Sequence, residues 1–276
     1  MATLPETRRL LTAVCDIART AGHAILEVYR TDFAVARKSD DSPLTEADRA
    51  AHEIIVRGLA RLGDTPVLSE ESAPEDHATR RSWSRYWLVD PLDGTKEFLK
   101  RNGEFTVNIA LVDDHRAVLG VVYAPVLDRS YFGAVDLGAW REEAGRAAHA
   151  ISVEQTARSP LRVVGSRSHP APELAGYLAG LGPYEITDMG SSLKICLVAE
   201  GAADLYPRFG PTSEWDTAAA QAILESAGGR MIDKTGRPLR YNSKDDLLNP
   251  HFLAFGDPRR DWLAPIQDTR GRESRN

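Results

Sequence analysis

Short apolar runs dominate residues 63–141, and this feature constrains the fold of the chain more than any other. Apolar side chains recur every three or four residues over 5–30 and follow again at Ile54, Ile55 and Leu59, which predicts two helices before these runs. The runs are typical of strands in a buried sheet, and they lie at residues 67–68, 86–89, 105–112, 118–123, 129–135 and 139–141. We therefore expect a first half of the α+β class, in which two helices cover one face of a sheet.

The second half of the chain alternates strand-like and helix-like segments. The strand-like segments are 161–164, 184–186, 203–206 and 252–255, and the helix-like segments are 172–181, 192–200 and 216–227. This alternation is typical of the α/β class. The stretch 142–160 is polar and rich in Ala and Arg, so we expect the boundary between two halves there, with residues 1–150 on one side and 151–276 on the other.

Composition and charge exclude several classes of protein. The 276 residues include 34 Lys and Arg against 40 Asp and Glu, a net charge of −6 that argues against a nucleic-acid partner. Cys15 and Cys196 form no Cys-x-x-Cys pair, the first residues lack a secretory signature, and no stretch approaches the ~20 apolar residues of a membrane span. We expect a cytoplasmic protein without a transmembrane segment.

The segment 90–95, Asp-Pro-Leu-Asp-Gly-Thr, directly follows an apolar strand and carries the clearest chemical signal. Proline fixes the backbone and lacks an N–H, so the chain has to turn here. The turn brings the carboxylates of Asp90 and Asp93 together and leaves the Leu92 carbonyl free to face a cation. Mg²⁺ prefers a few charged oxygens, with water and substrate phosphate completing its octahedron. The segment therefore predicts a magnesium site.

Gly94 and Thr95 then begin a short helix that reaches Phe98. The free N–H groups and the dipole at such a helix start favour a phosphate held against the metal. The alternative is an acidic turn with a helix cap, for which either aspartate alone would suffice. An EF-hand is excluded, because the D-x-D-x-D-G spacing and the closing glutamate are absent.

Two further acidic features lie elsewhere in the chain. Glu70 and Glu71 end the short strand at 67–68, and Asp216 follows Trp215 at the start of a helix of small residues. Paired acids are common in solvated loops, and aspartate is a common helix N-cap. Neither feature alone indicates a metal site.

The acidic features taken together resemble those of a known family. In their order along the chain, residues 70–71, 90–95 and 215–219 resemble the signature of the inositol monophosphatase superfamily of Mg²⁺-dependent, lithium-sensitive phosphatases. Segments 96–108, 190–194 and 206–212 resemble the bacterial 3′(2′),5′-bisphosphate nucleotidases within it. The resemblance covers roughly residues 8–256 and implies a layered αβαβα sandwich of the inositol monophosphatase/fructose-bisphosphatase type.

The resemblance assigns roles to individual residues. It implies that two or three Mg²⁺ ions bind to Glu70, Asp90, the Leu92 carbonyl, Asp93 and Asp216. It also implies that Thr95, paired with Asp48, helps to activate a water molecule, while Glu70 orients the metal shell. Asp48 has an alternative role, because Thr45 and Asp48 have the spacing of a capping box with a shorter acid.

Arg208 bears on the choice of substrate. Inositol monophosphatases tend to carry at this position a glutamate that binds ring hydroxyls, so a cation here favours a second phosphate over a neutral polyol. Lys194 and the segment 166–169 add donors that can reach the same place. The predicted substrate-binding residues are Glu70, Leu92, Asp93, Gly94, Thr95, Ser166, His169, Ser191, Ser192, Lys194, Arg208 and Asp216.

These residues predict a phosphatase that removes the 3′-phosphate of adenosine 3′,5′-bisphosphate, giving AMP and phosphate and clearing a by-product of sulfate assimilation. One alternative is an inositol or sugar monophosphatase, and another is a non-catalytic sensor that binds Mg²⁺ or a nucleotide. The expected partner is a small nucleotide bisphosphate, with no nucleic acid and at most a peripheral contact with the cytoplasmic face of the inner membrane. The sequence leaves a monomer and a homodimer equally open.

Overall fold

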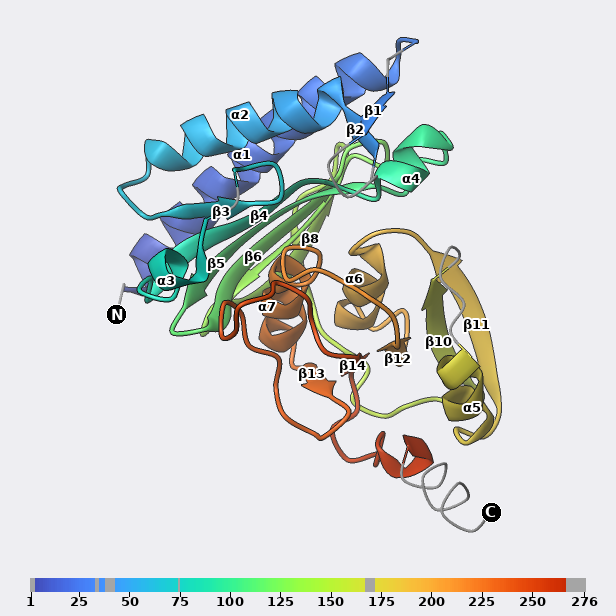
Figure 1. The fold of residues 1–276 in the computed structure, drawn as a ribbon. Helices are drawn as coiled ribbons and strands as arrows, with labels where there is room; N and C mark the ends of the chain where they lie inside the picture. The colour runs from blue at the N-terminus through green and yellow to red at the C-terminus, as the bar shows by residue number, and fades with distance from the viewer. Residues whose placement is uncertain (1–2, 33–34, 38–42, 74, 167–171, 267–276) are drawn as a thin grey trace.

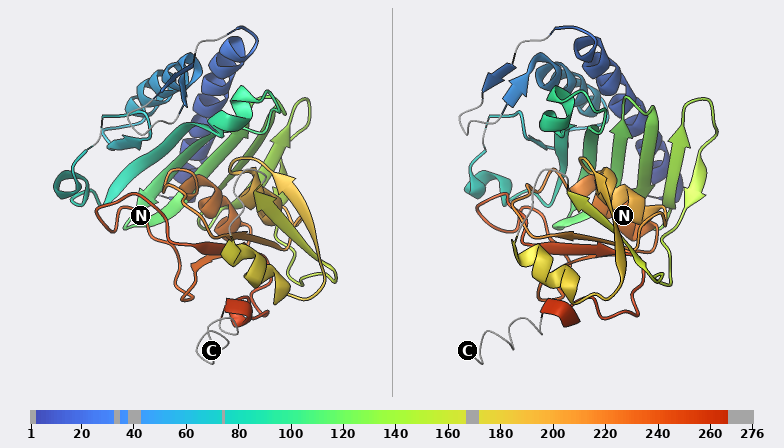
Figure 2. Two further views of the ribbon diagram at one scale, coloured as in Figure 1. Left: turned by 45° about the vertical axis from the view of Figure 1, so that its right-hand side comes forward. Right: turned by 90° about the vertical axis from the view of Figure 1, so that its right-hand side faces the viewer.

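The computed structural model describes residues 3–266 except 33–34, 38–42, 74 and 167–171. Within these residues the chain forms five stacked layers: helices, a large sheet, helices, a second sheet and an outer helix layer (Figures 1 and 2). This arrangement is the αβαβα sandwich that the resemblance implied. None of the described helices combines the length and the apolar character needed to cross a membrane.

Helices α1 (Leu4–Tyr29) and α2 (Glu46–Ala60) form the first layer. The α1 helix begins at a capping box, in which the Thr3 hydroxyl accepts from the Glu6 amide and the Glu6 carboxylate accepts from the Thr3 amide. Its buried face repeats every three or four residues, and it consists of Leu11, Val14, Cys15, Ala18, Ala21, Gly22 and Ile25. Both helices bury these faces against the large sheet, as their spacing predicts.

The large sheet has the order β3-β4-β5-β6-β7-β8-β9, in which only the β3–β4 pair is parallel. Its strands are β3 (Val67–Ser69), β4 (Arg85–Asp93), β5 (Thr106–Asp113), β6 (Arg116–Ala124), β7 (Arg129–Ala134), β8 (Gly138–Glu143) and β9 (His149–Ile151). Short helices α3 (His77–Arg80) and α4 (Thr95–Leu99) flank β4, and β1 (Val35–Arg37) pairs with β2 (Pro43–Thr45) beside it. The apolar runs of the first half are confirmed as strands of one sheet.

The second sheet has the order β11-β10-β12-β14-β13. Its strands are β10 (Leu161–Ser166), β11 (Tyr184–Met189), β12 (Leu205–Arg208), β13 (Arg230–Asp233) and β14 (Phe252–Phe255). Helices α6 (Leu193–Ala199) and α7 (Ala218–Ser226) lie between the two sheets, and α5 (Pro172–Ala179) lies on the outer face (Figure 1). The middle helix layer joins the halves, because one apolar cluster contains side chains from both sheets and from α6 and α7.

Helix α7 lies unusually close to the large sheet. Gly120 of β6 makes this approach possible, since a Cβ atom there would meet the Ala219 carbonyl oxygen at 2.0 Å. Close packing places the first turn of α7, and the Asp216 that precedes it, directly over the sheet.

Some elements differ from the expectations. The polar stretch 142–160 contains the end of β8 and all of β9, which pairs with β8 through the backbone although His149 and Ala150 are exposed. An edge strand held by backbone bonds needs no apolar pattern, so the sequence does not reveal it. The first sheet thus continues to Ile151, while the division of the chain into two domains stays a prediction.

Candidate active site

The last residues of β4 carry two carboxylates across an irregularity in the strand. Its pairing with β5 shifts register between Asp90, which faces Asn108, and Asp93, which faces Thr106. The irregularity lies at Pro91, which has no amide to donate to the neighbouring strand. The Leu92 amide donates instead to the Asp90 Oδ1 at 3.0 Å. The turn expected at Pro91 is instead an irregularity within β4, which continues to Asp93, and the chain leaves the strand only at Gly94, whose φ is +92°.

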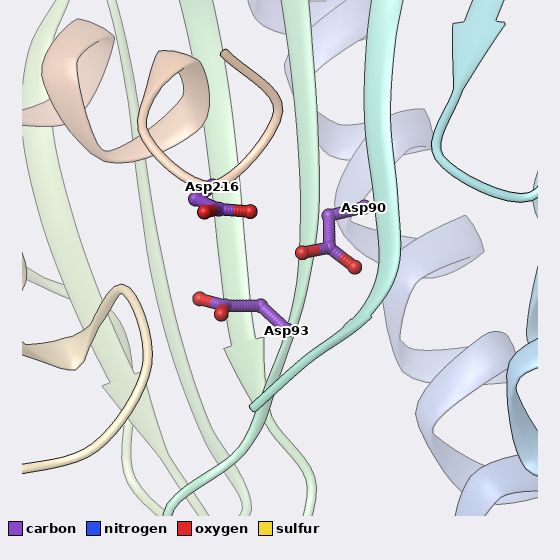
Figure 3. A group of neighbouring side chains, drawn as sticks. All are labelled: Asp90, Asp93 and Asp216. Carbon is purple, nitrogen blue, oxygen red and sulfur yellow. The ribbon is translucent and has the colours of Figure 1, made fainter. Parts of the chain in front are cut away.

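Three carboxylates converge at this point. Asp90 and Asp93 at the end of β4 meet Asp216 from the loop before α7, and one oxygen of each lies within 4.8 Å of the others (Figure 3). Burial and the neighbouring carboxylates raise the pKa of Asp90 and of Asp216 well above the usual range. A cluster of buried, mutually repelling carboxylates is favourable only when cations neutralise it, and its all-oxygen donor set suits Mg²⁺.

Glu70, the residue directly after β3, completes this group. Its amide donates to the Val89 carbonyl at 3.1 Å, which continues the parallel pairing of β3 with β4. The Glu70 carboxylate lies close enough to Asp90 to raise the pKa of that residue, both by its charge and by hydrogen bonding. The Leu92 carbonyl accepts a 3.4 Å hydrogen bond from the Thr95 hydroxyl. Four of the predicted metal ligands thus offer side-chain oxygens to one region.

The position of Asp93 is fixed by residues from both halves of the chain. Its Oδ2 accepts from the Ser192 amide at 2.7 Å, from the Ser192 hydroxyl at 2.9 Å and from the Asn108 amide nitrogen at 3.2 Å. Asn108 in turn accepts from Thr106, which also bonds Ser191. We did not predict Asn108 or Thr106 as site residues. The available signal was that both are polar within the apolar run 105–112.

A cavity of about 220 Å³ opens beside these carboxylates. The predicted residues that line it are Asp93, Gly94, Thr95, Ser191, Ser192, Lys194, Arg208 and Asp216. Met189, Tyr206 and Phe252 contribute an apolar wall that we did not predict. Tyr206 and Phe252 are far apart in the sequence. The pairing of β12 with β14 brings them together, with ring centroids 5.7 Å apart.

Two cations line the same cavity. Lys194 is 8% exposed, and its ammonium group donates to the Ser191 carbonyl at 2.6 Å. Burial lowers the pKa of Lys194 to about 8, helped by the charge of Arg208 and opposed by that of Asp93. The Arg208 guanidinium donates to the Thr212 hydroxyl and to the Pro211 carbonyl, both at 2.6 Å. The cavity is therefore lined by both carboxylates and cations.

The remaining predicted residues are placed less closely. Asp48 is 1% exposed in the first turn of α2, and α2 packs against β4. Its pairing with Thr95 stays a prediction. Ser166 ends β10 and pairs in register with Met189 of the cavity wall, although its side chain is outside the described part. His169 lies outside the described residues.

Comparison with known families and proteins agrees with this geometry. A sequence profile of the Inositol monophosphatase family matches residues 6–259, and the chain belongs to this family. The chain is 56% identical over 246 residues to the 3′(2′),5′-bisphosphate nucleotidase CysQ of Salmonella typhimurium, covering 88% of this chain and 98% of that protein. CysQ of Haemophilus influenzae is 37% identical, with 97% of this chain and 99% of that protein covered.

Solved structures confirm the expected fold class. CysQ from Bacteroides thetaiotaomicron, a bacterial member of the inositol monophosphatase family, superposes with a TM-score of 0.80 at 44% identity, covering 91% of this chain and 98% of that one. Inositol monophosphatase from Anabaena superposes with a TM-score of 0.74 at 24% identity, covering 96% and 97%. The second match establishes the shared fold alone.

Proposed function

We propose that this protein is a phosphatase that hydrolyses the 3′-phosphate of adenosine 3′,5′-bisphosphate to give AMP and phosphate. One observation carries the proposal: a single cavity is lined by Asp93 and Asp216 of the acidic cluster and by the cations Lys194 and Arg208. A substrate with two phosphate groups fits both parts of this cavity. The relatives named 3′(2′),5′-bisphosphate nucleotidase, 37–56% identical over most of the chain, support the same assignment.

The acidic cluster is the proposed metal site. Glu70, Asp90, Asp93 and Asp216 would hold two or three Mg²⁺ ions together with the Leu92 carbonyl, because four clustered carboxylates need about that much positive charge. Bound Mg²⁺ would lower the pKa of a water molecule and stabilise the charge that develops in an in-line displacement at phosphorus.

The residues of the chain orient the reacting groups. Thr95 lines the cavity beside Gly94, and its hydroxyl, already bonded to the Leu92 carbonyl, would align the attacking water with help from Asp48. Glu70 would orient the metal shell beside Asp90. Ser192 holds Asp93 in place through two hydrogen bonds, so the geometry is set before substrate binds.

Arg208 and Lys194 would bind the other phosphate of the substrate. Arg208 is held by Thr212 and by the Pro211 carbonyl, which orients the guanidinium toward the cavity at little further entropic cost. Two cations on one cavity favour a second anionic group over the hydroxyl groups of a neutral ring. Inositol phosphates should therefore be poor substrates.

The decisive experiment compares phosphate release from adenosine 3′,5′-bisphosphate and from inositol 1-phosphate, each with Mg²⁺, with EDTA and with Mg²⁺ plus Li⁺. We expect fast release from the nucleotide, none in EDTA and inhibition by Li⁺. Faster turnover of the inositol ester would overturn the nucleotide assignment, and turnover in EDTA would overturn the metal mechanism. Nucleotide binding without any release would instead indicate a sensor.

We further propose a cytoplasmic location, with at most peripheral contact with the inner membrane. Cys15 and Cys196 are buried free thiols, which suits a reducing compartment. Burial raises the pKa of the Cys15 thiol to about 12 and also raises that of Cys196, so neither is a reactive thiolate. The absence of a nucleic-acid partner and the choice between monomer and homodimer stay predictions.

A further inference from the structure

The loop that carries Asp216 is bonded to a second loop, residues 242–249. The Glu214 amide donates to the Leu247 carbonyl and the Asn249 amide donates to the Thr212 carbonyl, both at 2.8 Å. The Asn249 side chain adds a 2.7 Å bond to the Ser213 carbonyl. The position of loop 242–249 therefore determines where the backbone before Asp216 lies.

Asn242, at the start of this second loop, joins it to Glu214. The Asn242 amide donates to the Glu214 Oε2 at 2.7 Å, and both residues are only 1% exposed. Asn242 has a φ of +52°, a left-handed conformation that asparagine tolerates better than most residues. The other oxygen of Glu214, Oε1, is buried without a hydrogen-bond partner. Loss of the Asn242 bond would leave a second buried oxygen unpaired, so this bond constrains both loops.

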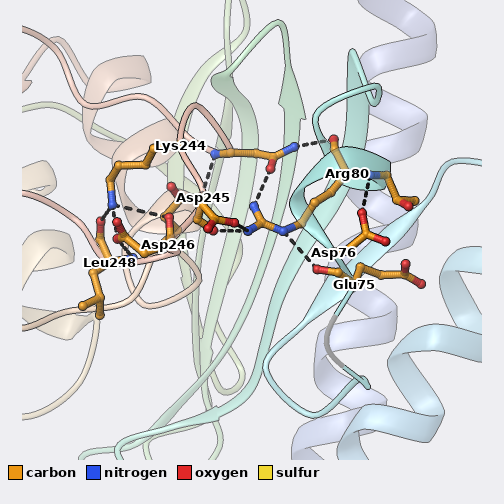
Figure 4. Close-up of polar contacts among 10 residues, drawn as sticks. Glu75, Asp76, Arg80, Lys244, Asp245, Asp246 and Leu248 are labelled. Carbon is orange, nitrogen blue, oxygen red and sulfur yellow. Dashed lines mark hydrogen bonds and ion pairs between the residues drawn. The ribbon is translucent and has the colours of Figure 1, made fainter.

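The side chain of Asn242 reaches across to Arg80 in the first half of the chain. Its Oδ1 accepts from the Arg80 guanidinium at 2.7 Å, and its Nδ2 donates to the Arg80 carbonyl at 2.6 Å. Arg80 is 4% exposed, and it also donates to the Glu75 and Asp245 carbonyls (Figure 4). Lys244 braces the same loop by donating to the Leu248 carbonyl and pairing with Asp246. The buried Arg80 therefore helps to hold loop 242–249 in position.

The contacts of Asn242 with Arg80 and Glu214 connect two segments that carry predicted metal ligands. Arg80 lies in the connection between β3, which Glu70 directly follows, and β4, which carries Asp90. Glu214 lies two residues before Asp216. Carboxylates that repel one another stay together before a cation arrives only if the backbones that carry them are held.

We propose that Arg80, Asn242 and Glu214 are positioning residues that hold Asp216 at the distance from Asp90 that Mg²⁺ binding requires. The inference rests on the metal site of the proposed function. It adds that the Mg²⁺ affinity of that site depends on contacts made away from the substrate cavity.

The test measures Mg²⁺ binding to the full chain by isothermal titration calorimetry, without substrate. Asn242→Gly keeps the left-handed backbone and the amide bond to Glu214 but removes both side-chain bonds to Arg80. Glu214→Ala removes the acceptor, whereas Glu214→Gln keeps one. We expect about tenfold weaker Mg²⁺ binding for the Gly and Ala variants and near-normal binding for the Gln variant.

Asp257→Ala is the matched control. Asp257 is 7% exposed and accepts from the Ala157 and Arg259 amides, so its loss also frees loop amides, but in a loop that carries no metal ligand. We expect it to lower the melting temperature without changing the Mg²⁺ dissociation constant. Steady-state kinetics should agree: the Mg²⁺ concentration for half-maximal rate rises in the Gly and Ala variants, while KM for the nucleotide at saturating Mg²⁺ is unchanged.

The outcomes separate this inference from the proposed function. Unaltered Mg²⁺ affinity in Asn242→Gly would overturn the positioning role, and so would an equal loss of affinity in Asp257→Ala. If Glu214→Ala does not fold, Asn242→Gly decides the question alone. A wild-type protein that binds no Mg²⁺ would overturn the metal site itself.

Discussion

Ser192 donates two hydrogen bonds to one carboxylate oxygen of Asp93, through its amide at 2.7 Å and its hydroxyl at 2.9 Å. Ninety-nine residues separate the two along the chain. The contact joins the start of α6 to the end of β4, so the helix that carries Lys194 is aligned with the acidic cluster. Metal and substrate sites are thereby positioned relative to each other.

Ser192→Ala should weaken this alignment without abolishing it. The variant loses the hydroxyl, which lies 2.9 Å from the Asp93 Oδ2 and 2.5 Å from the Asp216 carbonyl and accepts from the Asn108 side chain, while the amide bond to Asp93 remains. Loss of a hydrogen bond at this charged site costs about 1.5 kcal/mol, or roughly tenfold. We expect the Mg²⁺ concentration for half-maximal rate to rise by about that factor. Ser82→Ala, which removes a serine bond to the Thr79 carbonyl outside the site, is the control. Equal behaviour of the two variants would contradict the role of Ser192.

The metal-free protein should lose stability as pH rises. The folded-state pKa of Asp90 is raised above its unfolded value of about 3.9, so the folded state binds more protons in that range. The free energy of unfolding should therefore fall from about pH 4 upward, until the pH passes the raised pKa. Urea titrations in EDTA measure this slope.

Asp90→Asn removes the titrating group and should be the more stable protein near pH 7 in EDTA, although its activity should fall at least about 100-fold with the loss of a metal ligand. Mg²⁺ should remove the pH slope from the wild type. A wild type whose stability relative to Asp90→Asn does not fall from pH 4 to pH 7 in EDTA would contradict the electrostatic account of the cluster.

Arg208→Glu should reverse the preference of the cavity for a second phosphate. A repulsive carboxylate replaces a charge-assisted hydrogen-bond donor, so kcat/KM for adenosine 3′,5′-bisphosphate should fall at least about 100-fold. Inositol 1-phosphate turnover should not fall. Arg237→Glu makes the same charge change at an exposed residue and serves as the control. A parallel loss on both substrates would show that Arg208 does not act in substrate selection.

Lys194 should make nucleotide binding sensitive to alkaline pH. Burial lowers the pKa of Lys194 to about 8, so in the free protein its positive charge is lost as pH rises through that value. KM for the bisphosphate should rise several-fold between pH 7.5 and 9, because Lys194 loses its positive charge over that range. Lys194→Met should have a high KM that no longer varies, and Lys96→Met, on the same cavity, should keep the wild-type profile.

Gly120→Ala should destabilise the middle of the sandwich. The added methyl group would collide with the Ala219 backbone, and such overpacking costs about 1–3 kcal/mol. Urea unfolding measures the loss. An unchanged midpoint would mean that α7 can move away from the sheet without penalty.

Local patterns made much of this protein predictable. The three- and four-residue repeat of α1 and the apolar runs of β4 to β7 depend only on which side chains face the core, so they are visible in the sequence. The irregularity of β4 at Pro91 is equally local, because proline has no amide to donate to the neighbouring strand. By contrast, β9 is held by its backbone bonds to β8, and α3 is a single turn, so neither has a side-chain pattern to detect.

The sequence by itself determined most of the helices and strands, the acidic motifs at 70–71, 90–95 and 215–219, and the cation at Arg208, because each is a property of neighbouring residues. Only the tertiary structure decided that Asp216 meets Asp90, that Ser192 and Asn108 hold Asp93, and that Arg80 reaches the loop before Asp216. These contacts join residues far apart in the chain, and packing of one sheet, one helix layer and a second sheet sets their distances. Spacing along a sequence carries no information about such distances.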